Sequence, residues 1–353
     1  MRIKRSLPIV LGVVAIAISV ALVVELRKHA PPEAARLLPG ADVFVYVNLK
    51  WVRTVAAIGQ LPPVSHEPDY EQFIQQTGFQ FERDLDEAAF AVHYPGNAGT
   101  VAAGSSQQPH FSEVFVGRFQ VERLRAYLQQ KSKSLDTYRA TEIFNIPLEG
   151  RTVRVAILGV DTVAVSNLDD QLVIRGMVDR SRKLASPFGG PALLRQYYKQ
   201  VPIASLAWAI AKVGPRTGLP SGFWATIFPR AAMLVVSARF LRALHLRAEA
   251  FTGSADDATA IADKVGTYLN LFHSAENAVS PRGGDPDVKA FFDSLRVSQQ
   301  HDRAVLTAIM PGGFIHKIFV EAPQQIGAPP TGEKPSEPAE QAKPEKQSRS
   351  APK

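Results

Sequence analysis

The residue types that most often do chemistry are scattered along this sequence without a shared motif. The chain has 353 residues, eight of them histidine and none cysteine. No two histidines have the i, i+4 spacing that places two imidazoles on one helix face for zinc. The absence of cysteine excludes disulfides, thiolate metal sites and a cysteine nucleophile. The histidines are His29, His66, His93, His110, His245, His273, His301 and His316.

Two acidic segments contain residue types that could form a site. The cluster His66-Glu67-Pro68-Asp69 lies in a Pro-rich stretch, and Glu82 precedes Asp84, Asp86 and Glu87. Paired carboxylates can serve as acid and base or bind calcium. The second segment lacks the glycine and the regular oxygen ligands of a calcium loop. Both segments are therefore predicted to be solvated turns.

Serine and glycine motifs also fail to predict a catalytic centre. Neither Gly104-Ser105 nor Gly253-Ser254 has the Gly-x-Ser-x-Gly frame of a nucleophile elbow. The paired glycines stand beside proline without a following Lys-Ser or Lys-Thr, so no phosphate loop is predicted. Ser254 is predicted to cap a helix that begins near Ala255. We therefore predict no catalytic, cofactor-binding or metal-binding residue and no cofactor.

The most distinctive segment is an apolar stretch at the N-terminus. Residues 7–26 contain one charge and provide 20 positions, enough for a helix to cross a hydrocarbon core roughly 30 Å thick. Three basic residues precede it, which favours a cytoplasmic N-terminus. We expect a single-pass inner-membrane protein whose main domain is periplasmic or extracellular. A cleaved signal peptide and a buried core helix are the alternatives.

The charge balance argues against nucleic acid as a partner. The net charge is +7, but residues 1–30 hold five Lys or Arg against one Glu and so contribute +4. The remaining 323 residues contribute only +3 and contain no basic run or nucleic-acid-binding motif.

Composition divides the chain into four parts. Residues 1–30 form the basic stub and anchor. Residues 31–185 and 186–321 are predicted to form two α+β halves. Residues 322–353 contain seven prolines and one large aliphatic residue, so they are predicted to be a disordered tail.

Alternating apolar residues predict an α+β fold with antiparallel sheets that have one face covered by helices. Expected strands cover 43–49, 88–93, 114–119, 152–158, 161–166 and 244–252. Expected helices cover 51–58, 69–77, 121–130, 171–182 and 255–272.

An internal duplication is one interpretation of the two halves. Glu113–Gly117 resembles Glu249–Gly253, and Arg151–Leu158 resembles Arg303–Met310, in the same order. Pro39–Trp51 and Pro202–Gly214 form a further candidate pair. Chance similarity between strand–helix–strand units is the alternative.

Two segments resemble an uncharacterised family of bacterial envelope proteins. They are Leu37-Leu38-Pro39-Gly40-Ala41-Asp42, which leads into the strand ending Tyr46-Val47-Asn48-Leu49, and the segment Thr77–Asp86. The resemblance implies one N-terminal anchor and an exported α+β domain. The family has no established activity, so the resemblance implies location and fold class only.

The leading functional hypothesis is a non-enzymatic binding or structural domain for an unidentified envelope or protein partner. Trp208, Phe223 and Trp224 lie in or near the Pro/Gly-rich stretch 214–229, which is the candidate partner surface; buried packing is the alternative for these residues. The competing hypothesis is an extracytoplasmic hydrolase whose catalytic residues come from distant parts of the chain.

Overall fold

The computed structural model describes residues 30–59, 66–94, 108–182, 189–215, 223–279 and 286–315. The predicted membrane anchor at 7–26 and the predicted tail at 322–353 lie outside these ranges. Within them, no helix combines the length and the apolar character needed to cross a bilayer.

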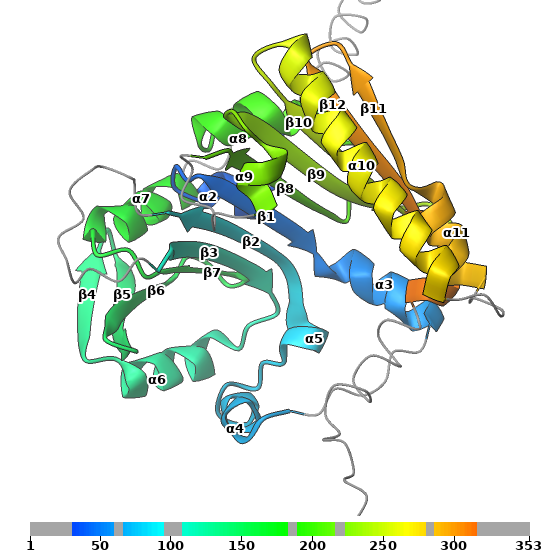
Figure 1. The fold of residues 1–353 in the computed structure, drawn as a ribbon. Coiled ribbons are helices and arrows are strands. Elements are labelled where there is room, and N and C mark those ends of the chain that lie inside the picture. The colour runs from blue at the N-terminus through cyan, green and yellow to red at the C-terminus, as the bar shows by residue number, and fades with distance from the viewer. Residues whose placement is uncertain are drawn as a thin grey trace, which may run out of the picture.

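The described strands form one twelve-stranded sheet in which every neighbouring pair is antiparallel (Figure 1). The spatial order is β11-β12-β10-β9-β8-β1-β2-β3-β7-β6-β5-β4. The strands are β1 (Val43–Asn48), β2 (Leu85–His93), β3 (His110–Gly117), β4 (Ser134–Tyr138), β5 (Thr141–Leu148), β6 (Arg151–Ile157), β7 (Thr162–Ser166), β8 (Ala207–Val213), β9 (Ala232–Phe240), β10 (Leu244–Phe251), β11 (Arg296–Gln300) and β12 (Arg303–Met310).

The helices connect these strands and pack against the sheet. They are α2 (Glu33–Leu37), α3 (Leu49–Gly59), α4 (Pro68–Thr77), α5 (Phe81–Asp84), α6 (Val121–Lys131), α7 (Gln171–Ser181), α8 (Ala192–Tyr197), α9 (Phe223–Ile227), α10 (Ala255–Val279) and α11 (Pro286–Ser294), with a 3₁₀ turn at Tyr198–Gln200. The α+β class predicted from the sequence is therefore confirmed.

Helices cover both faces of the sheet, which corrects the expectation of one covered face. Neighbouring residues of a strand point to opposite faces. Ile143 of β5 packs in the cluster that holds α7 residues, whereas its neighbour Phe144 packs with Leu124 and Leu128 of α6. The sheet is consequently the middle layer of the domain.

Strands β1 and β8 meet near the middle of the sheet. Their register pairs Tyr46 with Trp208, and the two rings stack at 5.5 Å between centroids. One buried cluster combines Phe44, Ile174, Leu194 and Val235, so it draws on residues from both predicted halves. The division at residue 185 stays a prediction.

The strand order shows which of the segments matched by the proposed duplication occupy equivalent positions in the sheet. Glu113–Gly117 and Glu249–Gly253 lie at the ends of β3 and β10, which are both third in their run outward from the β1–β8 pair. The segments from Arg151 and Arg303 do not match in position. Strand β12 lies beside β10, whereas β7 separates β6 from β3.

The predicted helix end at Gly78 and the predicted helix cap at Ser254 are both confirmed. Helix α4 ends at Gly78, whose φ of 72° is the left-handed conformation that glycine adopts without strain. The Ser254 hydroxyl accepts the Asp257 N–H at 3.2 Å, as predicted for a helix cap. The strand predicted to run to Phe119 ends instead at Gly117, and the helix predicted to end at Phe272 runs to Val279.

Candidate functional site: an apolar cavity beneath a long helix

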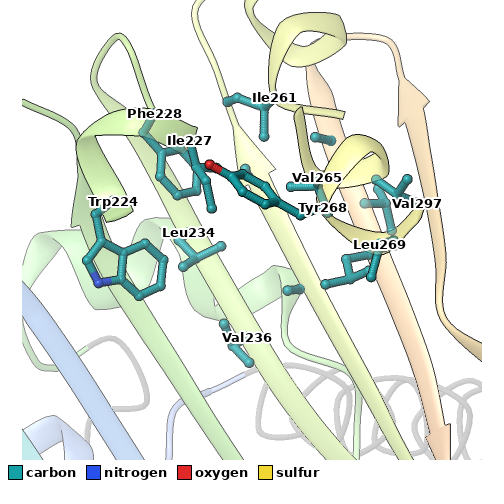
Figure 2. A pocket seen from close by; sticks show the side chains of 15 residues that line it. Trp224, Ile227, Phe228, Leu234, Val236, Ile261, Val265, Tyr268, Leu269 and Val297 are labelled. Atoms are coloured by element: carbon teal, nitrogen blue, oxygen red, sulfur yellow. The ribbon is translucent and has the colours of Figure 1, made fainter. Parts of the chain in front are cut away.

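A cavity with almost entirely apolar walls lies between α10 and the strands β9, β10, β12 and β11 (Figure 2). Helix α9 closes one side, and the volume is about 310 Å³. Its walls are Trp224, Ile227, Phe228, Leu234, Val236, Ala248, Ala250, Ile261, Val265, Tyr268, Leu269, Val297, Ala304, Val305 and Leu306.

Strand alternation builds the floor of this cavity. Leu234 pairs with Ala250 across β9 and β10, and Ala250 pairs in turn with Ala304 of β12. Paired residues lie on the same face of the sheet. Because alanine is small, this row leaves open the volume that leucine or phenylalanine would fill.

Helix α10 supplies the roof. Ile261, Val265, Tyr268 and Leu269 follow one another at intervals of four, three and one residues, which places them on one side of a helix. Tyr268 extends from α10 toward Ile227, the last residue of α9, and Phe228, which follows it (Figure 2).

The walls contain no acid, base or nucleophile suited to catalysis. Tyr268 and Trp224 are the wall residues whose side chains carry a polar atom, and the remaining thirteen are aliphatic or phenyl groups. Small-molecule sites are typically of this kind, with volumes of roughly 300–1,000 Å³ and few polar groups. The cavity is therefore chemically suited to binding.

The tryptophans of the candidate partner surface have different roles. Trp208 is 3% exposed and contacts Tyr46 and Tyr198, which confirms the alternative of buried packing. Trp224 stacks on Phe228 with ring centroids 6.0 Å apart and lines the cavity. Residues 216–222 and the Phe223 side chain lie outside the described part of the structure.

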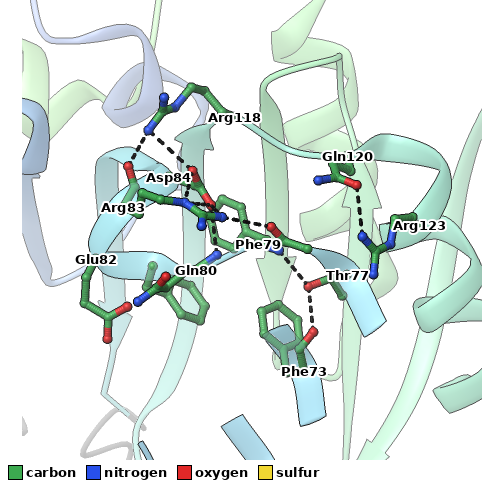
Figure 3. Close-up of polar contacts among 12 residues, drawn as sticks. Phe73, Thr77, Phe79, Gln80, Glu82, Arg83, Asp84, Arg118, Gln120 and Arg123 are labelled. Atoms are coloured by element: carbon green, nitrogen blue, oxygen red, sulfur yellow. Dashed lines mark hydrogen bonds and ion pairs between the residues drawn. The ribbon is translucent and has the colours of Figure 1, made fainter. Parts of the chain in front are cut away.

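The acidic patch is not the solvated turn that was predicted. Asp84 is only 7% exposed, and its carboxylate accepts the Gln80 N–H at 3.0 Å (Figure 3). Arg83 donates to it at 2.7 Å, and Arg118 pairs with it at 3.3 Å. The hydrogen bond from Arg83 is the main cause of the lowered pKa of Asp84. This carboxylate fastens α5 to the chain that follows β3.

The other acids of the patch contact separate partners. Asp86 pairs with Arg53, and Glu82 accepts the Tyr70 hydroxyl at 2.9 Å. Burial raises the pKa of Glu87, which lies beside Tyr46. The four carboxylates therefore do not form one acid–base or calcium site.

In the His66–Asp69 cluster, Glu67, Pro68 and Asp69 are exposed as predicted, whereas His66 has side-chain partners. Its Nδ1 lies 3.2 Å from Glu71 and its Nε2 lies 3.3 Å from Glu82, and the side chain is 14% exposed. Among the residues with described positions, no three His, Asp or Glu side chains are arranged to hold a metal ion.

His93, Ser112 and Asp42 are the three residue types of a serine hydrolase triad. The His93 Nε2 lies 3.4 Å from the Ser112 Oγ, and a cavity of about 430 Å³ reaches His93 and Asp42. Burial lowers the pKa of His93, and the Asp42 carboxylate opposes part of that shift. Ser112, however, has no exposed surface and also contacts the Ser166 hydroxyl at 3.1 Å. A substrate could not reach this serine, so the trio provides no nucleophile for the hydrolase hypothesis.

Comparisons with known proteins add little. No protein-family profile matches the chain, and no curated protein matches it. Crystal form III of TP0453 is 12% identical over 82% of this chain and 98% of the other, with a TM-score of 0.42. Crystal form IV of TP0453 is 11% identical over 81% and 95%, also with a TM-score of 0.42. Similarity at this level gives no information on function.

Proposed function

We propose that this chain is a membrane-anchored, extracytoplasmic and non-enzymatic binding protein, and that its ligand is an apolar molecule held beneath α10. The observation that carries the proposal is the cavity of about 310 Å³ with almost entirely apolar walls.

The apolar walls of the cavity favour an occupant. Because the cavity is partly open to solvent, its walls keep apolar surface in contact with water when no ligand is bound. Covering such surface with an apolar ligand is favourable by about 25 cal/mol for each Å² removed from water. An apolar ligand restores the missing van der Waals contacts, while water would find few hydrogen-bonding partners there.

The anchor and the internal duplication belong to the same proposal. The sequence of residues 7–26 and the three basic residues before it support a single span with the folded domain outside the cytoplasm. The duplication is supported by two runs of strands, β1-β2-β3 and β8-β9-β10, which extend in opposite directions from the β1–β8 pair.

Filling the cavity tests the binding function. Ala250 is 4% exposed and lies in the floor, so Ala250→Leu adds three carbon atoms to the space. The probe is N-phenylnaphthylamine, an uncharged dye that fluoresces in apolar surroundings. We expect the full-length protein in lipid nanodiscs to bind the dye above the bilayer background, and the variant to lose most of that signal.

The matched control is Ala126→Leu, which adds the same atoms at an exposed position of α6. It should bind the dye as the wild type does. Thermal unfolding of Ala250→Leu should show no loss of stability, because the new atoms fill existing space. Equal dye binding by the wild type and a folded Ala250→Leu protein would contradict the proposal.

A further inference from the structure

A second cavity, of about 260 Å³, lies under the N-terminus of α7 and has mainly polar walls. Strands β4, β5 and β6 form its floor. Ser134, Asn145 and Arg154 are direct cross-strand neighbours there, so their side chains lie on the same face of the sheet.

Arg154 is the unusual residue of this cavity. It is 8% exposed, and one guanidinium nitrogen donates to the Leu168 carbonyl. Its Nε has no hydrogen-bond partner. Over the part of the chain that the structure describes, no carboxylate lies within ion-pair distance of Arg154. A buried charge without a counter-ion is costly, so this position favours an anionic ligand.

Neighbouring groups add positive potential. Lys133 lines the same cavity, and so does Gln171, the first residue of the eleven-residue helix α7. The N-terminus of α7 is already capped by the Asp170 carboxylate, which accepts the Leu172 N–H at 2.8 Å, so the positive potential of the cavity comes from Arg154 and Lys133. The one acid in the cavity wall is Asp136, which accepts a hydrogen bond from the Asn145 amide at 2.9 Å.

We propose that this cavity binds a small hydroxylated molecule through an oxyanion group, either a carboxylate or a phosphate. The planar guanidinium of Arg154 suits such a group because it can donate two parallel hydrogen bonds. Ser134, Thr152 and the Asp136 carboxylate supply the oxygen atoms that hydroxyl groups on the ligand would contact. This site does not depend on the apolar cavity, which lies among β9–β12 on other strands.

Calorimetric titration of the full-length protein in nanodiscs of uncharged, zwitterionic lipid tests the site. The probes are glucuronate, glycerol phosphate and inorganic phosphate, with glucose as the uncharged comparison. We expect at least one of the oxyanions to bind and glucose not to bind. Tighter binding of glucuronate than of glycerol phosphate would identify a carboxylate as the preferred group, and the reverse would identify a phosphate. If inorganic phosphate alone binds, the inference that the ligand carries hydroxyl groups is wrong.

Two variants connect binding to this cavity. Arg154→Gln removes the guanidinium and should weaken oxyanion binding about tenfold or more. Because a buried substitution can disturb folding, Gln171→Glu provides an independent test. Gln171 is exposed at the start of α7, where an acid is favourable for the helix, yet its charge would repel the ligand.

The control is Arg125→Gln on α6, which removes a positive charge over the opposite face of the same strands. It should leave the affinity unchanged. Failure of every oxyanion to bind the wild-type protein would overturn the proposal. So would equal affinity in the wild type and in folded Arg154→Gln and Gln171→Glu proteins.

Discussion

Asp84 shows how one buried carboxylate can hold several segments together. It receives hydrogen bonds from the Gln80 backbone and the Arg83 side chain, and it pairs with Arg118 beyond β3. Its own carbonyl accepts the Arg118 N–H at 2.9 Å. Side chain and backbone of this residue therefore join α5 to the start of the segment that leads into α6.

We expect Asp84→Asn to destabilise the protein by about 1–3 kcal/mol, because donors aimed at a carboxylate lose their acceptor. The lowered pKa in the folded state means that the stabilisation is complete above the unfolded pKa of about 3.9. It disappears as the pH falls through the folded value. Urea unfolding should thus show the largest difference between wild type and variant near neutral pH and little difference in strong acid.

The exposed Asp169 provides the control for this experiment, since Asp169→Asn changes the same chemical group at an exposed position. Its free energy of unfolding should match that of the wild type at each pH. A difference between wild type and Asp84→Asn that does not change with pH would show that the carboxylate charge is not the source of the stabilisation.

At the scale of elements, the two glycines that the repeated motif aligns are in different surroundings. A Cβ atom on Gly117 would lie 2.5 Å from the Asp84 carbonyl oxygen and 3.1 Å from the Leu85 Cα. At Gly253 a Cβ would meet nothing within 4 Å. The two glycines therefore match in sequence, but only Gly117 lies where the close approach of another backbone segment requires a residue without a Cβ atom.

Gly117→Ala should destabilise the fold by about 1–3 kcal/mol, because the methyl group must displace backbone atoms. Gly253→Ala is its matched partner and should change the free energy of unfolding by less than about 0.5 kcal/mol. Denaturant midpoints measure both. Equal losses in the two variants would contradict the close approach at Gly117.

Several elements with strong local patterns were predicted from the sequence, but β9 was not, although it contains the apolar run Met233-Leu234-Val235-Val236. Helices α4, α6 and α7 have regular apolar spacing, and their predicted bounds are within a residue or two of the observed ones. Strands β4 and β5 were not predicted. Three of the five β4 residues are exposed, and β5 contains Asn145 and Pro147, so neither strand alternates cleanly. Strand β4 pairs with β5, and β5 pairs in turn with β6, so the positions of both strands depend on pairing between strands and not on a pattern within either one.

Neither cavity could be predicted from the sequence. The floor of the apolar cavity combines alanines from β10 and β12, which alone are indistinguishable from ordinary core residues. Arg154 lies in an alternating strand where an exposed arginine would be expected. The predicted partner surface at 214–229 does contain the wall residues Trp224, Ile227 and Phe228, but the α10 residues that face them lie more than 30 positions further along the chain.

At the scale of the molecule, one sheet joins both predicted halves through β1 and β8 (Figure 1). The buried cluster on one face includes residues from both runs of strands. Cooperative unfolding of the described domain is the expected behaviour for such shared packing.

The proposed topology is testable on the same scale. A reporter that is active only outside the cytoplasm, fused after Lys353, should be active, because a single N-terminal span places everything after it on the far side. A reporter that is active only in the cytoplasm serves as the control and should be silent. The opposite pair of results would reverse the proposed orientation.

The order of strands also determines how the sheet ends. Its two outer strands, β4 and β11, are only five residues long, and most of their side chains are exposed. Four of the five β11 residues are polar or charged. An edge of this length offers few free backbone groups to another chain. A sheet twelve strands wide can thus remain a single molecule, with little risk of growing by edge-to-edge association.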